Sequence, residues 1–138
     1  MPKIRDRRRE YEELHRVLGL CEKCPTGALP GFGGYCFRHW LLKMFQKRGL
    51  TKGILIEKNR KLRELLVASL WGRYSAIAGG FLEPVGPEQC LIDSMEIRAR
   101  LGIGWAGQAG VRKLAGVMGS VERHAMRSRK EQNGLVHD

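Results

Sequence analysis

The sequence lacks the features of a membrane-spanning or exported chain. No apolar run approaches the roughly 20 residues that a membrane-spanning helix needs, and no signal peptide precedes the first charged residues. We therefore expect a protein without a membrane partner that is cytoplasmic or associated with the nucleoid. Hydrophobic residues make up 43% of the chain and charged residues 28%, which argues against a fully disordered protein.

Acidic residues are scarce relative to basic ones. The 25 Lys and Arg outnumber the 14 Asp and Glu, so the 138 residues carry a formal charge of +11. Such a surface attracts polyanions, and nucleic acid, either DNA or RNA, is the first candidate. The excess is concentrated in residues 1–9, 38–63 and 112–131, with net charges of +4, +8 and +4.

The middle stretch is the strongest, and we expect it to be the main phosphate-contacting surface. The plainer alternative is that these side chains only solvate helix surfaces. The candidate nucleic-acid-binding residues are Arg5, Arg7, Arg8, Arg9, Arg38, Lys43, Lys47, Arg48, Lys52, Lys58, Lys61, Arg63, Arg112 and Lys113.

Cysteine occurs at only four positions, and three of them stand with a histidine at metal-ligand spacing. The pattern is Cys21-x2-Cys24-x11-Cys36-x2-His39. Two such pairs, separated by about a dozen residues, are typical of tetrahedral zinc. Two alternatives to a metal site are disfavoured. Disulfides are rare in the reducing compartment that we expect for this protein. If the cysteines were buried free thiols, their paired spacing would be a coincidence. Because four protein ligands leave no open position for a water, we expect structural Zn²⁺.

The segment between the two ligand pairs is rich in glycine and proline, which favours a loop or small hairpin. Helical spacing follows from Phe37, so the second pair is expected on the first turn of a helix. A knuckle, a hairpin and a helix together describe a treble-clef-like module. The letters GLCEKC…GYCFRHW resemble the small Cys/His zinc modules of phage and bacterial mobile-element DNA-binding proteins, including HNH-associated ones. They are also similar in plan to zinc-binding small-subunit ribosomal proteins. The resemblance covers about residues 17–45 and implies a zinc module that accompanies nucleic acid.

Apolar and polar residues do not alternate with a period of two over any useful length, which is the pattern of a β-strand. We therefore expect a mostly α fold. The small zinc-stapled module is followed by a long helix and by a C-terminal helical hairpin or helix-turn-helix. Helices are predicted at about 6–18, 37–48, 51–78, 88–101 and 106–130, with stops at Gly19, Gly49 and Gly102. The expected divisions are a basic N-terminal helix or arm (1–19), the zinc module (20–49), the long basic amphipathic helix (50–78), the C-terminal unit (79–132) and a tail (133–138).

Two apolar sets are predicted within these helices. Residues 79–87, which are rich in proline and glycine, lie between the two helices that carry these sets and form the best candidate for a boundary in the chain. The third helix carries a continuous stripe that we expect to be core, made of Leu55, Leu62, Leu66, Leu70 and Tyr74. The fourth helix carries the apolar residues Leu91, Met95, Ile97 and Leu101.

Residues 102–107 read GIGWAG, which matches the spacing of a dinucleotide-binding loop. That loop requires a strand before it, whereas residues 95–101 have a helical pattern, so we exclude a cofactor site. Residues 95–116 resemble instead a helix-turn-helix of DNA-binding proteins, with Arg98 where a small residue is usual. A plain helical hairpin is the alternative.

No catalytic constellation stands out. The histidines are dispersed, and Cys90 has no base at a suggestive spacing, so we expect a small buried side chain there. The acids Glu83, Glu88, Asp93 and Glu96 offer ligands for Mg²⁺, although such side chains are commonly solvated. Aromatic residues near the charge offer stacking surfaces, although each is more often core: Phe37, Trp40, Phe45 and Trp105.

We therefore expect a zinc-containing basic protein that binds nucleic acid through phosphate contacts, without catalysis of its own. The alternatives are a structural subunit of a larger ribonucleoprotein or nuclease complex, a small phage or mobile-element nuclease, and a charge-based inhibitor of a partner.

Overall fold

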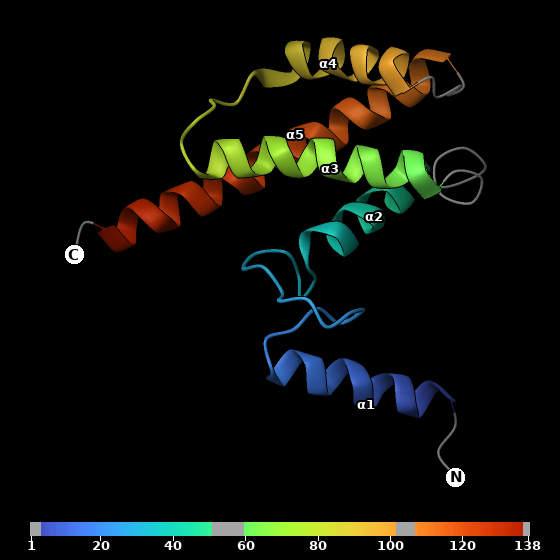
Figure 1. Ribbon diagram of the computed structural model, residues 1–138, viewed down its shortest axis with the longest axis vertical. Helices are drawn as coiled ribbons and strands as arrows, with labels where there is room; N and C mark the ends of the chain where they lie inside the picture. Colours follow the sequence, from blue (N-terminus) through green and yellow to red (C-terminus); the bar gives the residue numbers. More distant parts are fainter. Residues whose placement is uncertain (1–3, 51–59, 102–106, 137–138) are drawn as a thin grey trace. The chain divides into compact units, whose positions relative to one another are not determined.

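The computed structural model describes residues 4–50, 60–101 and 107–136, and these form five helices without a strand (Figure 1). The predicted mostly α fold is thereby confirmed. No helix within these ranges is both long and apolar enough to cross a membrane. The helices are α1 (Ile4–Val17), α2 (Phe37–Lys47), α3 (Arg60–Ala78), α4 (Gly86–Leu101) and α5 (Gly107–Val136).

The chain divides into two compact units, Met1–Lys43 and Met44–Asp138. The division falls inside α2, whereas the sequence suggested a boundary at residues 79–87. That segment lies within the second unit, where it connects α3 to α4. Proline and glycine there end one helix and begin another without separating two cores.

Helix α1 ends at Gly19, as the sequence predicts. The Leu20 amide donates to the His15 carbonyl at 2.8 Å, and the Gly19 amide donates to the Arg16 carbonyl at 3.2 Å. This pair of bonds requires a left-handed residue, and Gly19 has φ of +72°. The same pattern ends α2, where the Leu50 amide donates to the Phe45 carbonyl at 2.8 Å.

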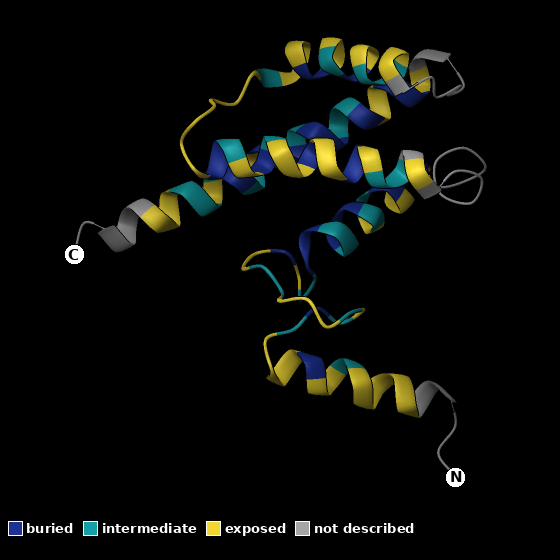
Figure 2. Cartoon of the chain, viewed as in Figure 1, coloured by how far each residue is buried: buried dark blue, intermediate teal, exposed yellow. Residues whose placement is uncertain are grey.

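Helix α5 is the centre of the second unit, and both α3 and α4 pack against it (Figure 1). Its buried residues recur at intervals of three and four, which places them on the faces toward these neighbours (Figure 2). They include Val111, Leu114, Val117, Met118, Val121 and Ala125.

The stripe predicted on the third helix is buried at Leu66, Leu70 and Tyr74. Leu55 and the predicted helix start at Thr51 lie outside the described residues, as does the side chain of Leu62. From Arg60 to Ala78 the predicted helix is confirmed.

Helix α4 turns a different face to α5 than its apolar residues suggest. Leu91 is 36% exposed and Met95 is 50% exposed, while Cys90 and Ser94 are fully buried. The small side chains of Cys90 and Ser94 allow close approach of the two helices. The Ser94 hydroxyl is satisfied because it donates to the Cys90 carbonyl at 2.7 Å. The inner face of α4 is therefore made by these small residues and not by the apolar Leu91 and Met95.

The last helix is longer than predicted. It continues to Val136, past the predicted end at about residue 130 and into the predicted tail (133–138). Residues 102–106, which include Ile103 and Trp105, lie outside the described residues. Both the helix-turn-helix and the plain helical hairpin therefore stay predictions.

Candidate metal centre and basic surfaces

The four predicted metal ligands lie together at one point of the first unit. Cys21, Cys24, Cys36 and His39 place their ligand atoms within 4.8 Å of one another. The Sγ atoms of Cys24 and Cys36 are 3.8 Å apart, and His39 Nδ1 lies 3.6 Å from Cys21 Sγ and 3.3 Å from Cys36 Sγ.

These separations fit the edges of a zinc tetrahedron. Bonds of about 2.3 Å to sulfur and about 2.05 Å to nitrogen give S···S edges of about 3.8 Å and S···N edges of about 3.6 Å. The donor set of three thiols and one imidazole also suits zinc. The residues therefore fit a metal ion that is closed off by four protein ligands.

Backbone hydrogen bonds position the first ligand pair. The Cys21 amide donates to the Thr26 carbonyl at 2.7 Å, which closes the turn that holds Cys21 and Cys24. The Lys23 amide lies 3.4 Å from Cys21 Sγ, where it donates to the sulfur. A single isolated β-bridge joins Leu20 to Gly27. Of the loop or small hairpin expected between the two ligand pairs, the structure has the loop, since residues 25–35 contain no strand.

The second ligand pair is held by the start of α2. Cys36 caps this helix, since its carbonyl accepts from the Trp40 amide at 2.9 Å, and His39 lies on the first turn. The buried Phe32 packs edge-on against Trp40, with ring centroids 4.8 Å apart. Phe37 is buried in the same cluster. These aromatic rings fix the loop against α2 and therefore fix the ligand geometry.

Proton affinities differ among the ligands. Burial lowers the pKa of His39, with help from the charges of Arg38 and Lys23, so the neutral imidazole that binds metals is favoured. Burial opposes ionisation of Cys24, but hydrogen bonds from Thr26 and the neighbouring cysteines lower its pKa. Burial raises the pKa of Cys36 to about 11. The Cys36 thiolate therefore depends on a cation for its stability.

Helix α1 is attached to the metal loop by three side-chain contacts. The buried His15 ring places Nδ1 2.7 Å from the Cys21 carbonyl oxygen. Arg16 pairs with Glu22 at 3.1 Å, and Lys23 pairs with Glu12 at 3.0 Å. Tyr11, Leu14 and Leu18, which share one face, remain exposed. Polar contacts rather than an apolar face therefore hold α1 to the loop.

The carboxylates considered for Mg²⁺ do not form a metal site within the described ranges, where the Cys/His cluster is the single group of three or more suitable ligands. Asp93 binds Arg73 at 2.5 Å instead, and Glu83 binds Arg129 at 2.8 Å. Cys90 is 1% exposed, and burial raises its pKa to about 11, with a further contribution from the charge of Glu122. It is the inert buried thiol that the sequence predicts.

The predicted nucleic-acid-binding residues fall into different environments. Arg8 pairs with Glu12 at 3.3 Å, Arg63 pairs with Glu64 at 3.3 Å, and Lys43 lies 4.7 Å from the centre of the Tyr35 ring. Lys52 and Lys58 lie outside the described residues, as does the side chain of Arg5. Arg8 and Lys43 are exposed, as are Arg7, Arg9, Lys47, Arg48, Lys61, Arg112 and Lys113, while Arg38 and Arg63 are half-buried.

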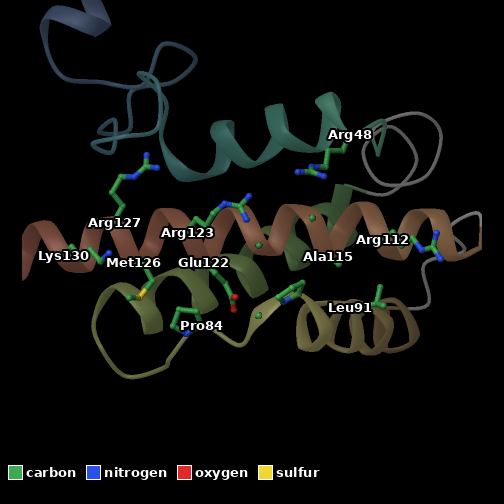
Figure 3. A pocket seen from close by; sticks show the side chains of 14 residues that line it. Arg48, Pro84, Leu91, Arg112, Ala115, Glu122, Arg123, Met126, Arg127 and Lys130 are labelled. Atoms are coloured by element: carbon green, nitrogen blue, oxygen red, sulfur yellow. The ribbon is translucent and has the colours of Figure 1, made fainter.

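The structure brings Arg48 and Arg112 into one groove of about 830 Å³ in the second unit (Figure 3). Arg123, Arg127 and Lys130 line the same groove and were not among the predicted binding residues. Their spacing contained a signal, because positions 112, 123, 127 and 130 fall on one face of a continuous helix. We missed it by weighing the net charge of whole segments, although all four positions lie inside the predicted helix over 106–130.

Three of the four aromatic side chains considered for base stacking are core residues. Phe37, Trp40 and Phe45 are at most 7% exposed, and Trp105 lies outside the described residues.

In comparisons with known proteins, no family model, curated protein or solved structure matched this chain.

Proposed function

We propose that this is a zinc-containing protein that binds nucleic acid through phosphate contacts, without catalysis of its own. The metal would be held by Cys21, Cys24, Cys36 and His39, where it would stabilise the thiolates and tie the loop to α2. The proposal includes a module of the treble-clef-like kind found in mobile-element DNA-binding proteins, in a cytoplasmic or nucleoid-associated protein.

The observation that carries the proposal is an excess of basic side chains without acidic partners. Several acidic side chains are already engaged, among them Glu12, Glu22, Glu83, Asp93 and Glu122. In the described part of the chain, eleven exposed cations have no ion pair: Arg9, Lys43, Lys47, Arg48, Lys61, Arg100, Arg112, Lys113, Arg123, Arg127 and Lys130. Nine of the eleven, all except Arg9 and Lys43, lie in the second unit. A phosphate backbone supplies the missing negative charge.

The arrangement offers little support for catalysis. Four side chains complete the coordination of the candidate metal, which leaves no position for a reactive water. The buried Cys90 thiol has a raised pKa of about 11, which disfavours the nucleophilic thiolate. Binding rather than chemistry is the activity that these groups favour.

Salt titration of binding to labelled duplex DNA and to RNA of the same sequence tests the proposal. The logarithm of the affinity is expected to fall linearly with the logarithm of the salt concentration. On duplex DNA, each contacted phosphate should add about 0.9 to the magnitude of this slope. Submicromolar binding that is insensitive to base sequence would support a phosphate-contacting protein. Absence of binding to both nucleic acids at about 0.1 M salt would contradict it.

A further inference from the structure

The groove in the second unit runs along one face of α5. Its cations on α5 are Arg112, Arg123, Arg127 and Lys130. At 100° per residue these four positions lie within about 60° of one another around the helix. Arg112 and Lys130 are separated by about 27 Å along the axis, at 1.5 Å per residue. The row of charges is therefore long enough to contact several successive phosphates.

Small residues form the floor between these charges. Ala115, Gly116 and Gly119 line the groove on the same face of α5. They leave room for Arg48, which reaches toward α5 from the residue that follows α2 (Figure 3). A Cβ atom built on Gly116 would stand 2.8 Å from Arg48 Cζ, closer than atoms pack. Glycine at 116 therefore lets the guanidinium of Arg48 join the row.

The acid in the groove does not cancel this charge. Glu122 turns toward α3, where Arg73 Nη1 lies 3.0 Å from its Oε2, and its side chain is only 6% exposed. Its other oxygen, Oε1, lies 3.3 Å from the Val85 amide, which donates to it. Arg123 donates to the neutral Ser120 hydroxyl at 3.0 Å. Arg48, Arg112, Arg127 and Lys130 have no acidic partner in the described ranges.

The opposite wall of the groove is apolar. Pro84, Pro87 and Leu91 line it, and none of the lining residues is aromatic. A phosphodiester backbone matches this combination, since charged phosphates alternate with largely apolar sugar faces. Bases would find no ring on which to stack, so the groove offers no means of stacking-based base recognition.

We infer that this groove holds a single phosphodiester backbone of nucleic acid, one strand of a duplex or a single strand, through Arg48, Arg112, Arg123, Arg127 and Lys130. The inference rests on the proposed nucleic-acid binding and deepens it. It makes α5, rather than the strongly basic residues 38–63, the principal phosphate-contacting element.

Two matched triple variants of the full-length protein test the inference. R112Q/R127Q/K130Q removes three charges from the groove, and K47Q/K61Q/K113Q removes three charges from exposed positions outside its lining. Each is titrated with labelled duplex DNA and single-stranded DNA over a series of salt concentrations. The groove variant should bind at least tenfold more weakly at about 0.1 M salt and lose about 2 to 3 units of slope on duplex DNA. The other variant should lose less than one unit.

A steric variant tests the same geometry without removing a charge. Gly116→Ala should displace Arg48, and because alanine is the better helix former the helix should persist by circular dichroism. Its affinity should fall severalfold, and this loss should disappear in an Arg48→Gln background. Equal loss in both backgrounds would show that Arg48 does not act through Gly116.

The outcomes separate the inference from the function on which it rests. If the wild-type protein binds nucleic acid and both triple variants lose equal affinity, the groove assignment is overturned while the proposed function stands. If the wild-type protein does not bind, both fail. Two further results would overturn the phosphodiester assignment. One is that inorganic polyphosphate competes as well as DNA does at the same concentration of phosphate groups. The other is that the groove binds vesicles containing anionic phospholipid but does not bind DNA.

Discussion

Arg73 on α3 and Glu122 on α5 form an ion pair of 3.0 Å although they are 49 positions apart in the sequence. The same guanidinium binds Asp93 on α4 at 2.5 Å, so one side chain joins three helices. All three side chains are less than 20% exposed. The Cys90 thiol lies 3.6 Å from Glu122 on the same network. These polar contacts specify which faces of α3, α4 and α5 meet.

Arg73→Met should destabilise the second unit strongly. The variant leaves Asp93 and Glu122 as neighbouring carboxylates with little solvent and no countercharge, which costs about 3 to 5 kcal/mol. Arg129→Met is the control, because its partner Glu83 is 69% exposed and such a pair contributes less than about 1 kcal/mol. Urea unfolding measures both. Equal shifts in free energy would show that the Arg73 network contributes no more than a surface pair.

Acid should weaken the same network through Asp93. Burial opposes its ionisation, but hydrogen bonds from Gln89 and Arg73 and the Arg73 charge lower its pKa below 3.8. A lowered pKa in the folded state stabilises the protein above the unfolded value, and this stabilisation is lost as the pH falls through the folded value. Asp93→Asn should therefore reduce the free energy of unfolding at pH 7, and the difference from wild type should shrink below about pH 4. A difference that stays constant down to about pH 2 would contradict this assignment.

Leu66 and Leu65 are adjacent in α3 but differ in burial. Leu66 is fully buried and Leu65 is 45% exposed. Leu66→Ala should cost about 2 to 5 kcal/mol of unfolding free energy because it removes buried methyl groups and leaves a cavity. Leu65→Ala should change the same quantity by less than about 1 kcal/mol. Comparable losses in thermal or urea unfolding would mean that α3 presents a different face to α5.

The purified protein should carry one equivalent of zinc by elemental analysis. Cys24→Ser should reduce the content below half an equivalent, whereas Cys90→Ser should leave it unchanged because Cys90 is outside the cluster. The binding energy of such a site is largely folding energy, so metal removal should unfold residues 17–45. Normal zinc content in the Cys24 variant would exclude this ligand set.

Thiol labelling should distinguish the four cysteines by environment. In the metal-loaded protein at pH 8, we expect slow labelling of all four. Chelation should expose three thiols, and Cys90 should label only in denaturant because it is 1% exposed and burial raises its pKa to about 11. Mass spectrometry of the labelled peptides measures this. Rapid labelling of Cys90 before chelation would contradict its place in the core.

The spacing of residues within short segments explains most of the features of the fold and the candidate site that could be predicted from the sequence. The ligand set of Cys21, Cys24, Cys36 and His39 follows from two local pairs that a turn and a helix start can each present. The ends of α1 and α2 follow from Gly19 and Gly49, because local hydrogen bonds to a left-handed residue terminate a helix. The inner face of α3 follows from the recurrence of Leu66, Leu70 and Tyr74.

Contacts between distant segments decided the rest. The inner face of α4 consists of Cys90 and Ser94 because α5 approaches closely there, and hydropathy favours Leu91 and Met95 instead. The groove depends on Arg48 lying over Gly116, a contact between residues 68 positions apart. Amino-acid sequence alone determined the candidate metal ligands and the mostly helical structure of this protein, because these depend on spacing within short segments, and it determined the positive charge, which depends on composition. Only the tertiary structure decided which helix faces meet and which cations stand together, because packing brings together side chains whose separation in sequence carries no information about their separation in space.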